Sequence, residues 1–332
     1  MTPARAGFVV AAALAWSALA LCPPSSAGGP WDNSDPTPPS RPADTAPDSL
    51  TSHVSFAYSY HGSGSRMTSS NTSWSPPACW YEPEYSADGM EKYLHDNYVA
   101  EHIAKEVIGQ DQDPGGINYH TGEKGAWWQL KTPDLDTAQN CNAQHSWLWV
   151  KPGTPATPEV PVIDPATLAQ DAYNHTVLPA PPITLRPAPE NQLVNVDTQV
   201  TFDQPLTRVW VTARIDNALA DVHIAATTVA VPTQLRIDAG TDYADPRTCT
   251  YDLTPKGASY SVDTRNDACN VTYRKASPAG GSYPLTASIV WKVTWTPSAN
   301  PDGPPAAAPK LPDGQSVMTS QVTVQENQAV NR

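Results

Sequence analysis

Apolar and polar residues alternate along most of the second half of the chain. This period of two is typical of β-strands that bury one face and expose the other. Pro, Gly and Asp residues separate the alternating segments, as expected for turns. The pattern therefore predicts a mainly β fold, with an antiparallel β-sandwich over residues 164–330. Its strands are expected at residues 183–187, 193–202, 207–215, 221–231, 233–240, 248–253, 269–275, 283–295 and 316–325.

The first half of the chain mixes two patterns. Residues 54–60, 125–131 and 145–151 read as short strands. Between the first two, apolar residues recur every three or four positions over 86–109, which indicates an amphipathic helix. Ser86 or Asp88 can cap its start. We therefore expect a small α+β disulfide module over residues 53–150.

A second, short helix is predicted where the second module begins. Asp164 can act as its N-cap, and Pro165 suits the first helical position. Leu168, Ala169 and Ala172 then form one apolar stripe.

Proline-rich segments predict the boundaries between these parts. The chain of 332 residues contains 36 prolines, which disfavour long helices and favour loops and linkers. Residues 28–52 combine Pro, Ser and Asp and predict a disordered spacer. Residues 151–163 form a Pro/Thr linker between the two modules.

The N-terminus has the features of an export signal. An apolar run at 7–21 follows Arg5, and small residues at 25–27 suit a signal peptidase. We expect a signal peptide over residues 1–27 and a secreted or cell-wall-associated protein. An uncleaved membrane anchor and lipidation at Cys22 are the alternatives.

Four cysteines follow that segment, and an even number in an exported chain suggests disulfide bonds. The division into two modules favours Cys79–Cys141 and Cys249–Cys269, although the spacing allows three pairings. Free thiols are the alternative. A zinc site is disfavoured because no Cys-x-x-Cys pair occurs.

The net charge of the chain argues against several classes of binding partner. The formal net charge of −13 argues against DNA, RNA and anionic lipid, which all require a basic surface. No sequence feature calls for a cofactor. The remaining partners are a cell-wall glycan or an extracellular protein, with a membrane only if the N-terminal segment is retained.

Aromatic residues are concentrated in the first module. Trp80, Tyr81, Trp128 and Trp147 are candidate binding residues, because exposed rings stack on sugars. The alternative is that they fill a small core around a disulfide. The segment "SPPACWYEPEY" (75–85) favours this second interpretation, since its prolines restrict the unfolded chain and Cys79 anchors it.

The predicted long helix offers one weak metal candidate. Its members Glu91, His95, His102 and Glu106 share one helical face. Carboxylate and imidazole groups at this spacing can bind zinc, but a solvated polar face opposite the apolar stripe gives the same pattern. No Gly-x-Ser-x-Gly elbow or His-Glu-x-x-His motif is present, so no catalytic residue is assigned.

The second module resembles the C-terminal part of a group of secreted actinobacterial proteins of unknown function that carry a PKD-like β-sandwich. The residues that carry the resemblance are the helix start at Asp164-Pro165, the "LVN" segment at 193–195, the cysteines Cys249 and Cys269, and the strand at 283–295. "CWYEP" at 79–83 also resembles their N-terminal half. In "LRIDAGTD" (235–242), only the Asp and one Gly of the usual PKD turn are kept.

This resemblance implies an adhesion or spacer module. The sequence thus favours an exported non-catalytic protein with an extracellular or cell-wall interaction role. The alternatives are a secreted hydrolase directed at glycan or peptide, which would use carboxylates or the His/Glu face, and a glycan-binding module.

Overall fold

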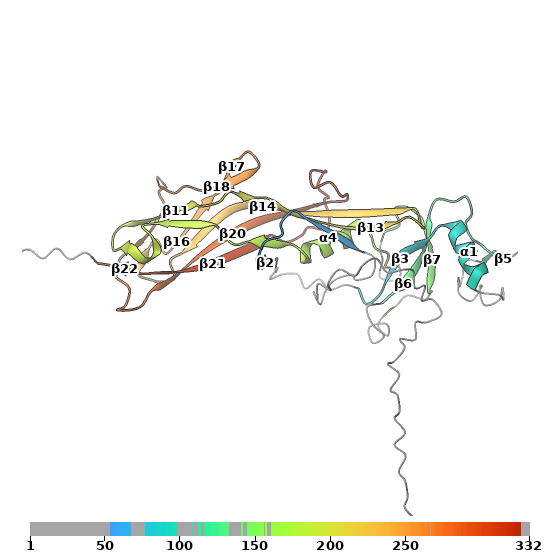
Figure 1. Ribbon diagram of the computed structural model, residues 1–332, viewed down its shortest axis with the longest axis horizontal. Helices are drawn as coiled ribbons and strands as arrows, with labels where there is room; N and C mark the ends of the chain where they lie inside the picture. Colours follow the sequence, from blue (N-terminus) through green and yellow to red (C-terminus); the bar gives the residue numbers. More distant parts are fainter. Residues whose placement is uncertain are drawn as a thin grey trace, which may run out of the picture. The chain divides into compact units, whose positions relative to one another are not determined.

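The computed structural model describes residues 54–67, 77–97, 108, 112–113, 116–132, 141, 145–155, 157, 161–265 and 267–326. The chain is mainly β, and two antiparallel sheets form its largest part (Figure 1). The expected signal peptide at 1–27 and spacer at 28–52 lie outside the described residues.

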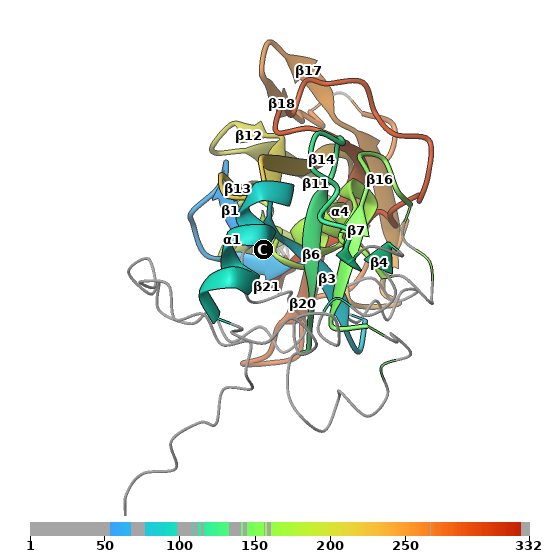
Figure 2. The same cartoon turned by 90° about the vertical axis from the view of Figure 1, so that its right-hand side faces the viewer.

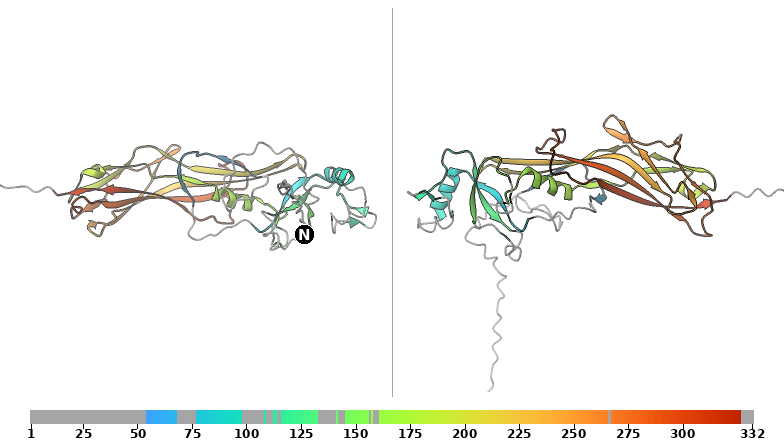
Figure 3. Two further views of the ribbon diagram at one scale, coloured as in Figure 1. Left: turned by 60° about the horizontal axis from the view of Figure 1, so that its bottom comes forward. Right: turned by 180° about the vertical axis from the view of Figure 1, so that it is seen from behind.

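The large sheet has six antiparallel strands. Five of them lie in the order β1 (Ser55–Tyr58), β13 (Val209–Asn217), β14 (Val222–Asp238), β20 (Tyr283–Thr296) and β21 (Gly314–Val322). The sixth, β16 (Thr248–Asp252), pairs with the second half of β14. The long strands β14 and β20 run side by side in Figure 3.

The second sheet faces the first across a common core. Its order is β15 (Ala244–Asp245), β19 (Val271–Tyr273), β11 (Asp197–Phe202) and β9 (Ile183–Arg186). Leu185, Val200 and Tyr273 of this sheet are buried in one cluster with Leu235 and Ile289 of the large sheet. The predicted antiparallel β-sandwich is confirmed.

Short strands complete this part of the chain. They are β2 (Gly64–Arg66) with β8 (Val177–Pro179), β10 (Gln192–Leu193) with β22 (Val324–Gln325), and β12 (Leu206–Thr207) with β18 (Ser259–Ser261) and β17 (Thr254–Lys256). The 3-10 turn η1 (Pro189–Asn191) precedes β10.

Strand β14 continues through a point where two separate strands were expected. Pro232 lies within it and pairs with Trp291 of β20 on one side. On its other side, β14 pairs with β13 up to Ala230 and with β16 from Gln234. Pro232 therefore lies in the gap between two partners, where the amide hydrogen that proline lacks is not needed.

The small sheet of the first half has the order β3 (Trp80–Tyr85), β6 (Ala126–Lys131) and β7 (Trp147–Val150). Figure 2 shows it together with α1 (Ala87–Asn97). The Ser86 hydroxyl oxygen accepts a hydrogen bond from the Gly89 amide at 3.1 Å, so Ser86 caps this helix. The remainder of the expected helix, at 98–107, is outside the described part. A two-stranded pair joins β4 (Gln112–Asp113) and β5 (Gly116–Ile117).

Helix α4 (Pro165–Asn174) begins as predicted. Asp164 accepts a hydrogen bond from the Thr167 amide at 2.8 Å, and Pro165 is the first helical residue. Leu168, Ala169 and Ala172 are fully buried. They pack on β13 and β14, along which α4 lies in Figure 1.

Two strands from the first half of the chain pair with strands of the second half, across the module boundary expected from the sequence. Strand β1 was assigned to the small module, but it pairs with β13 of the large sheet, and β2 pairs with β8. Residues 54–67 thus complete the C-terminal sheets. A short strand leaves its ladder groups unpaired unless it joins an existing sheet, and β13 offers that edge.

The linker is also partly built into the structure. Val162 and Ile163 are 2% and 1% exposed. The Tyr81 amide donates to the Pro161 carbonyl at 2.9 Å, and the Ile163 amide donates to the Tyr81 carbonyl at 3.3 Å. Residues 161–163 therefore act as a strand-like connection to β3, and only the preceding residues can serve as a linker. The described residues all belong to one compact unit.

Both favoured disulfides are present. Cys79 and Cys141 have their Cα atoms 5.5 Å apart, and those of Cys249 and Cys269 are 5.7 Å apart. In the chain-entropy model, each bond contributes about 3–4 kcal/mol to the free energy of unfolding.

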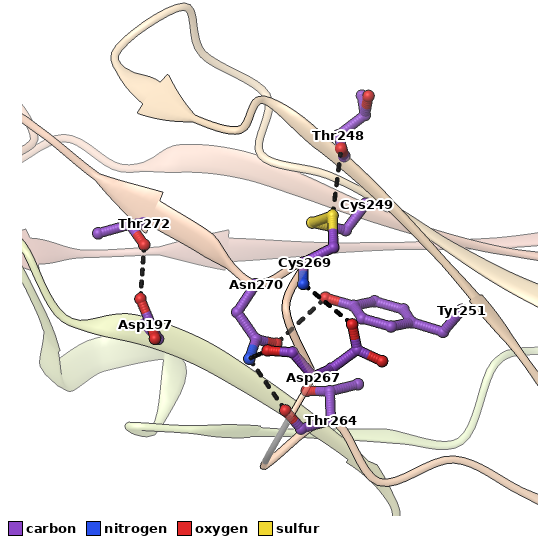
Figure 4. Close-up of a disulfide and its surroundings, with 9 residues drawn as sticks. All are labelled: Asp197, Thr248, Cys249, Tyr251, Thr264, Asp267, Cys269, Asn270 and Thr272. Atoms are coloured by element: carbon purple, nitrogen blue, oxygen red, sulfur yellow. Dashed lines mark hydrogen bonds between the residues drawn. A yellow bond between two sulfur atoms is a disulfide. The ribbon is translucent and has the colours of Figure 1, made fainter.

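Polar groups, most of them buried, surround the second disulfide (Figure 4). The Tyr251 hydroxyl donates to Asn270 Oδ1 at 3.2 Å, and Asn270 Nδ2 donates to the Thr264 carbonyl at 2.9 Å. Asp267 Oδ1 accepts from the Cys269 amide at 2.9 Å. The loop between the two cysteines is thus held by hydrogen bonds as well as by sulfur.

Candidate functional site

A groove of about 760 Å³ opens where the small sheet meets the β13–β14 hairpin and the start of α4. This volume lies within the range of sites for small molecules and short peptides. The lining residues come from five separate stretches of the chain, at 86–88, 122–126, 150–154, 163–165 and 220–225, with Trp128 and Pro297 in addition.

Hydrogen bonds between main-chain and side-chain groups hold two walls of the groove together. The Ser86 amide, just before α1, donates to the Leu219 carbonyl at 2.9 Å. Asn217 Nδ2 donates to the Pro83 carbonyl at 2.8 Å, while its Oδ1 accepts from the Leu219 and Ala220 amides. The turn of the β13–β14 hairpin is thereby joined to both β3 and the first turn of α1.

The floor of the groove is apolar. Trp128 and Val150 of the small sheet, both 5% exposed, lie there with Ile163 of the connection. Val222 and Ile224 of β14 complete it and are half-buried. All five pack in the cluster that includes α4, so the floor belongs to a core and is preformed.

One charged cluster lies on the rim. Glu123 Oε1 is 3.2 Å from His120 Nδ1, and Glu123 Oε2 is 3.5 Å from Lys151 Nζ. The hydrogen bond from His120, followed by electrostatic attraction to His120 and Lys151, holds the pKa of Glu123 below its usual range. Glu123 therefore remains ionised at the groove.

The loop that carries this cluster is fixed against a tryptophan. The His120 ring stacks on Trp149 with ring centroids 4.5 Å apart and nearly parallel planes. His120 has a φ of 60°, in the left-handed region that few non-glycine residues adopt. At Gly125, where φ is 153°, a Cβ atom would lie 2.8 Å from the Trp149 ring. The turn at 120–125 depends on both residues to bring Glu123 to the rim.

The other three acidic side chains that line the groove differ in their hydrogen bonds and ion pairs. Asp164 accepts hydrogen bonds from both the amide and the hydroxyl of Thr167. Asp88 and Asp221 are exposed, and within the described ranges neither forms an ion pair. The bond between Ser86 and Leu219 brings together the two segments that carry these carboxylates. They are available to a cationic group of a ligand.

The aromatic residues proposed for binding are buried. Trp80, Tyr81 and Trp147 are each 2% exposed, and Trp128 is 5% exposed. Trp80 Nε1 donates to the buried Glu82 Oε1 at 2.6 Å. The Tyr81 hydroxyl donates to the His145 carbonyl at 2.6 Å, and burial raises the pKa of Tyr81. These four rings act as core groups, and only Trp128 touches the groove.

The pairing of β6 with β7 explains this arrangement. Trp127 lies opposite Trp149, and Trp128 lies opposite Leu148, so the adjacent tryptophans point to opposite faces. Trp147 packs against Tyr85 and Tyr93 with ring centroids 5.8 and 5.7 Å away. Both faces of the small sheet are therefore covered.

The predicted metal candidates are only partly described. Glu91 and His95 are exposed on α1, whereas His102 and Glu106 lie outside the described residues. His95 Nδ1 is 3.5 Å from Asp96 Oδ1. Within the described ranges, no group of three or more His, Cys, Asp or Glu side chains could hold a metal ion.

Apart from Trp128, the sequence alone did not indicate which residues line the groove. Glu123, Lys151, Ile163 and Val222 come from stretches that carry no common motif. The only local signal is the pair of glycines at 122 and 125, which indicates a turn. Their convergence depends on the tertiary pairing of the hairpin with β3.

The chain has no match among protein-family models, curated proteins or solved structures. The resemblance to actinobacterial secreted proteins thus stays a prediction. Among the described helices, none has the length and apolar character needed to cross a membrane.

Proposed function

We propose that this protein is an exported, non-catalytic binding protein that acts outside the cytoplasm, at the cell wall or on an extracellular protein. Its groove at the junction of the small sheet and the β13–β14 hairpin would hold an extended peptide segment of the partner. The observation that carries the proposal is the preformed apolar floor beside two exposed carboxylates, Asp88 and Asp221.

Export is supported by the two disulfides and by the N-terminal sequence. Disulfides form and persist in oxidising compartments, and all four cysteines of the expected mature chain are paired. The apolar run at 7–21 with small residues at 25–27 has the pattern of a secretory signal peptide.

The composition of the groove favours a peptide over a sugar. Sugar sites present an open aromatic face, and Trp128, the aromatic residue that lines the groove, is 5% exposed. Apolar side chains of a peptide suit the floor formed by Val150, Ile163 and Ile224. A lysine or arginine of the same peptide suits Asp88 and Asp221.

A secreted hydrolase is the second candidate, because Asp88, Glu123, Asp164 and Asp221 all line one groove. A pair of carboxylates in hydrolysis needs one group with a raised pKa to act as the acid. The pKa of Glu123 is shifted in the opposite direction, and Asp164 is engaged by Thr167. Binding is therefore the better-supported role.

The test is retention on cell-wall material isolated from the producing organism. The variant Asp88→Lys/Asp221→Lys reverses the two exposed charges while leaving the core intact. We expect the unmodified protein to co-sediment with the wall and the variant to be retained about tenfold less, since two charge-assisted contacts are lost.

A matched control separates the groove from general charge. The variant Glu190→Lys/Asp203→Lys changes the net charge by the same amount at two exposed positions that do not line the groove. It should bind like the unmodified protein. Equal loss in both variants would reject the groove, and breakdown of wall peptide or glycan by the purified protein would favour the hydrolase.

A further inference from the structure

Strand β21 forms one edge of the large sheet and has an unusual composition for an edge. It pairs with β20 from Gly314 to Val322 and has no second strand neighbour in the described sheets (Figures 1 and 3). Its nine residues, "GQSVMTSQV", include no charged residue and no proline. Natural edge strands usually carry such residues, because an unprotected edge pairs with other chains.

Other sheet edges of this protein are protected in the usual ways. Strand β9 ends in Arg186 and is followed by Pro187, and β15 contains Asp245 followed by Pro246. Strand β17 is three residues long and includes Pro255 and Lys256. Strand β21, which at nine residues is longer than these three, carries none of these protections.

The free part of the edge has defined limits. At Gly314, a Cβ atom would meet Met67 Sδ at 2.7 Å and Leu178 Cδ1 at 3.0 Å, so this end is covered. Beyond the other end, the Thr323 amide donates to the Pro189 carbonyl at 2.8 Å. Between these points, no described residue outside β20 forms a hydrogen bond to the main chain of 315–321.

The sequence of this free part reads nearly the same in both directions. The residues are Gln315, Ser316, Val317, Met318, Thr319, Ser320 and Gln321. Antiparallel pairing with an identical strand, centred on Met318, would place Gln opposite Gln and Ser opposite Ser. Val317 would lie opposite Thr319, and both are β-branched residues that pair well across strands.

We propose that β21 pairs with β21 of a second copy of this chain, about a two-fold axis at Met318. A two-fold interface requires one surface to be complementary to itself, which this palindromic segment fulfils. It also lets two chains of net charge −13 meet along a stretch that has no charge to repel. Val317, which is 46% exposed, would be covered in the pair.

The expected affinity is modest. Seven residues on each side form a small interface compared with the roughly 1,200–2,000 Å² of stable complexes. Dissociation constants on the order of micromolar are therefore expected, and a dimer should form as protein concentration rises.

The test compares two double variants by sedimentation equilibrium of the full disulfide-bonded chain. In Val317→Lys/Thr319→Lys, each lysine would face a lysine of the partner copy, whereas in Val317→Lys/Thr319→Glu each lysine would face a glutamate. Both variants change the same exposed positions on the same face. We expect the first to weaken dimerisation about tenfold and the second to remain within about threefold of the unmodified protein.

Net charge cannot produce this result. The lysine pair makes the acidic chain less negative, which would strengthen a non-specific association rather than weaken it. Urea unfolding of each variant checks that the monomer is intact. A protein that remains monomeric up to about 1 mM, or two variants that dimerise equally well, would overturn the proposal.

Discussion

Tyr251 is an example of a buried polar side chain with a testable titration. It is 4% exposed in the core beside the Cys249–Cys269 bond and donates to Asn270 at 3.2 Å. Burial, and then the negative charge of Asp267, raise the pKa of Tyr251 to about 12. In the unfolded chain, the same phenol ionises near 10.

The pH dependence of stability follows from this difference. Below pH 10, the phenol is neutral in both states and the stabilisation is complete. Between pH 10 and 12, the unfolded state loses its proton first, so the free energy of unfolding declines by about 1.4 kcal/mol at pH 11. Urea unfolding at pH 8 and pH 11 measures this loss.

Tyr251→Phe is the control for this prediction. It should cost about 1 kcal/mol at pH 8 through the lost hydrogen bond. Its further decline between pH 8 and pH 11 should be smaller than that of the unmodified protein by the 1.4 kcal/mol given above. An identical decline in both proteins would show that Tyr251 is not the group that titrates.

At the scale of elements, β1 comes from the first half of the chain but stabilises the large sheet formed by the second half. Phe56 and Tyr58 pack against the cluster formed by α4 and β13, and the Phe56 ring stacks on His175 of the α4 C-cap with centroids 4.1 Å apart. A fragment of residues 164–330 would lack this strand and would expose the edge of β13.

We therefore expect the fragment 164–330 to be less stable than the chain 54–330 by several kcal/mol, since it loses a paired strand and the apolar area beneath it. Thermal unfolding of both chains with disulfides intact measures the difference. Equal midpoints would show that the second module folds independently, as the sequence alone predicts.

Several elements could be predicted from sequence because their signals are local. The alternation in β11 and β13 and the cap of α4 by Asp164 depend on neighbouring residues only. The merging of two expected strands into β14 could not be predicted, because Pro232 is tolerated only where two partner strands leave a gap. The pairing of β1 with β13 could not be predicted either, because the two strands are far apart in the sequence and the local pattern of β1 does not indicate which sheet edge it joins.

The candidate site, too, could be predicted from the sequence only in part. The burial of Trp80, Tyr81, Trp128 and Trp147 agrees with the core interpretation drawn from the disulfide and the small size of the module. The groove could not be predicted, since its walls meet through contacts such as Ser86 with Leu219, separated by more than a hundred residues. No local pattern reports a contact of this kind.

At the scale of the whole molecule, one account joins these features. An acidic chain, which we propose to be exported, folds into a sandwich and a small sheet, each closed by one disulfide, and they share a groove with an apolar floor. The unprotected edge of β21 lies on a different strand from those that line the groove, so a partner and a second copy could be bound together. The two disulfides are favoured in an oxidising compartment, so the proposed account depends on export of the chain.

The most direct test is the intact mass of the protein recovered from producing cells, measured with and without prior alkylation under non-reducing conditions. The account predicts that the protein is found outside the cytoplasm, begins near Gly28 and gains no mass on alkylation, because its four cysteines are paired. A cytoplasmic chain that still begins at Met1 and takes up an alkyl group at every cysteine would contradict it.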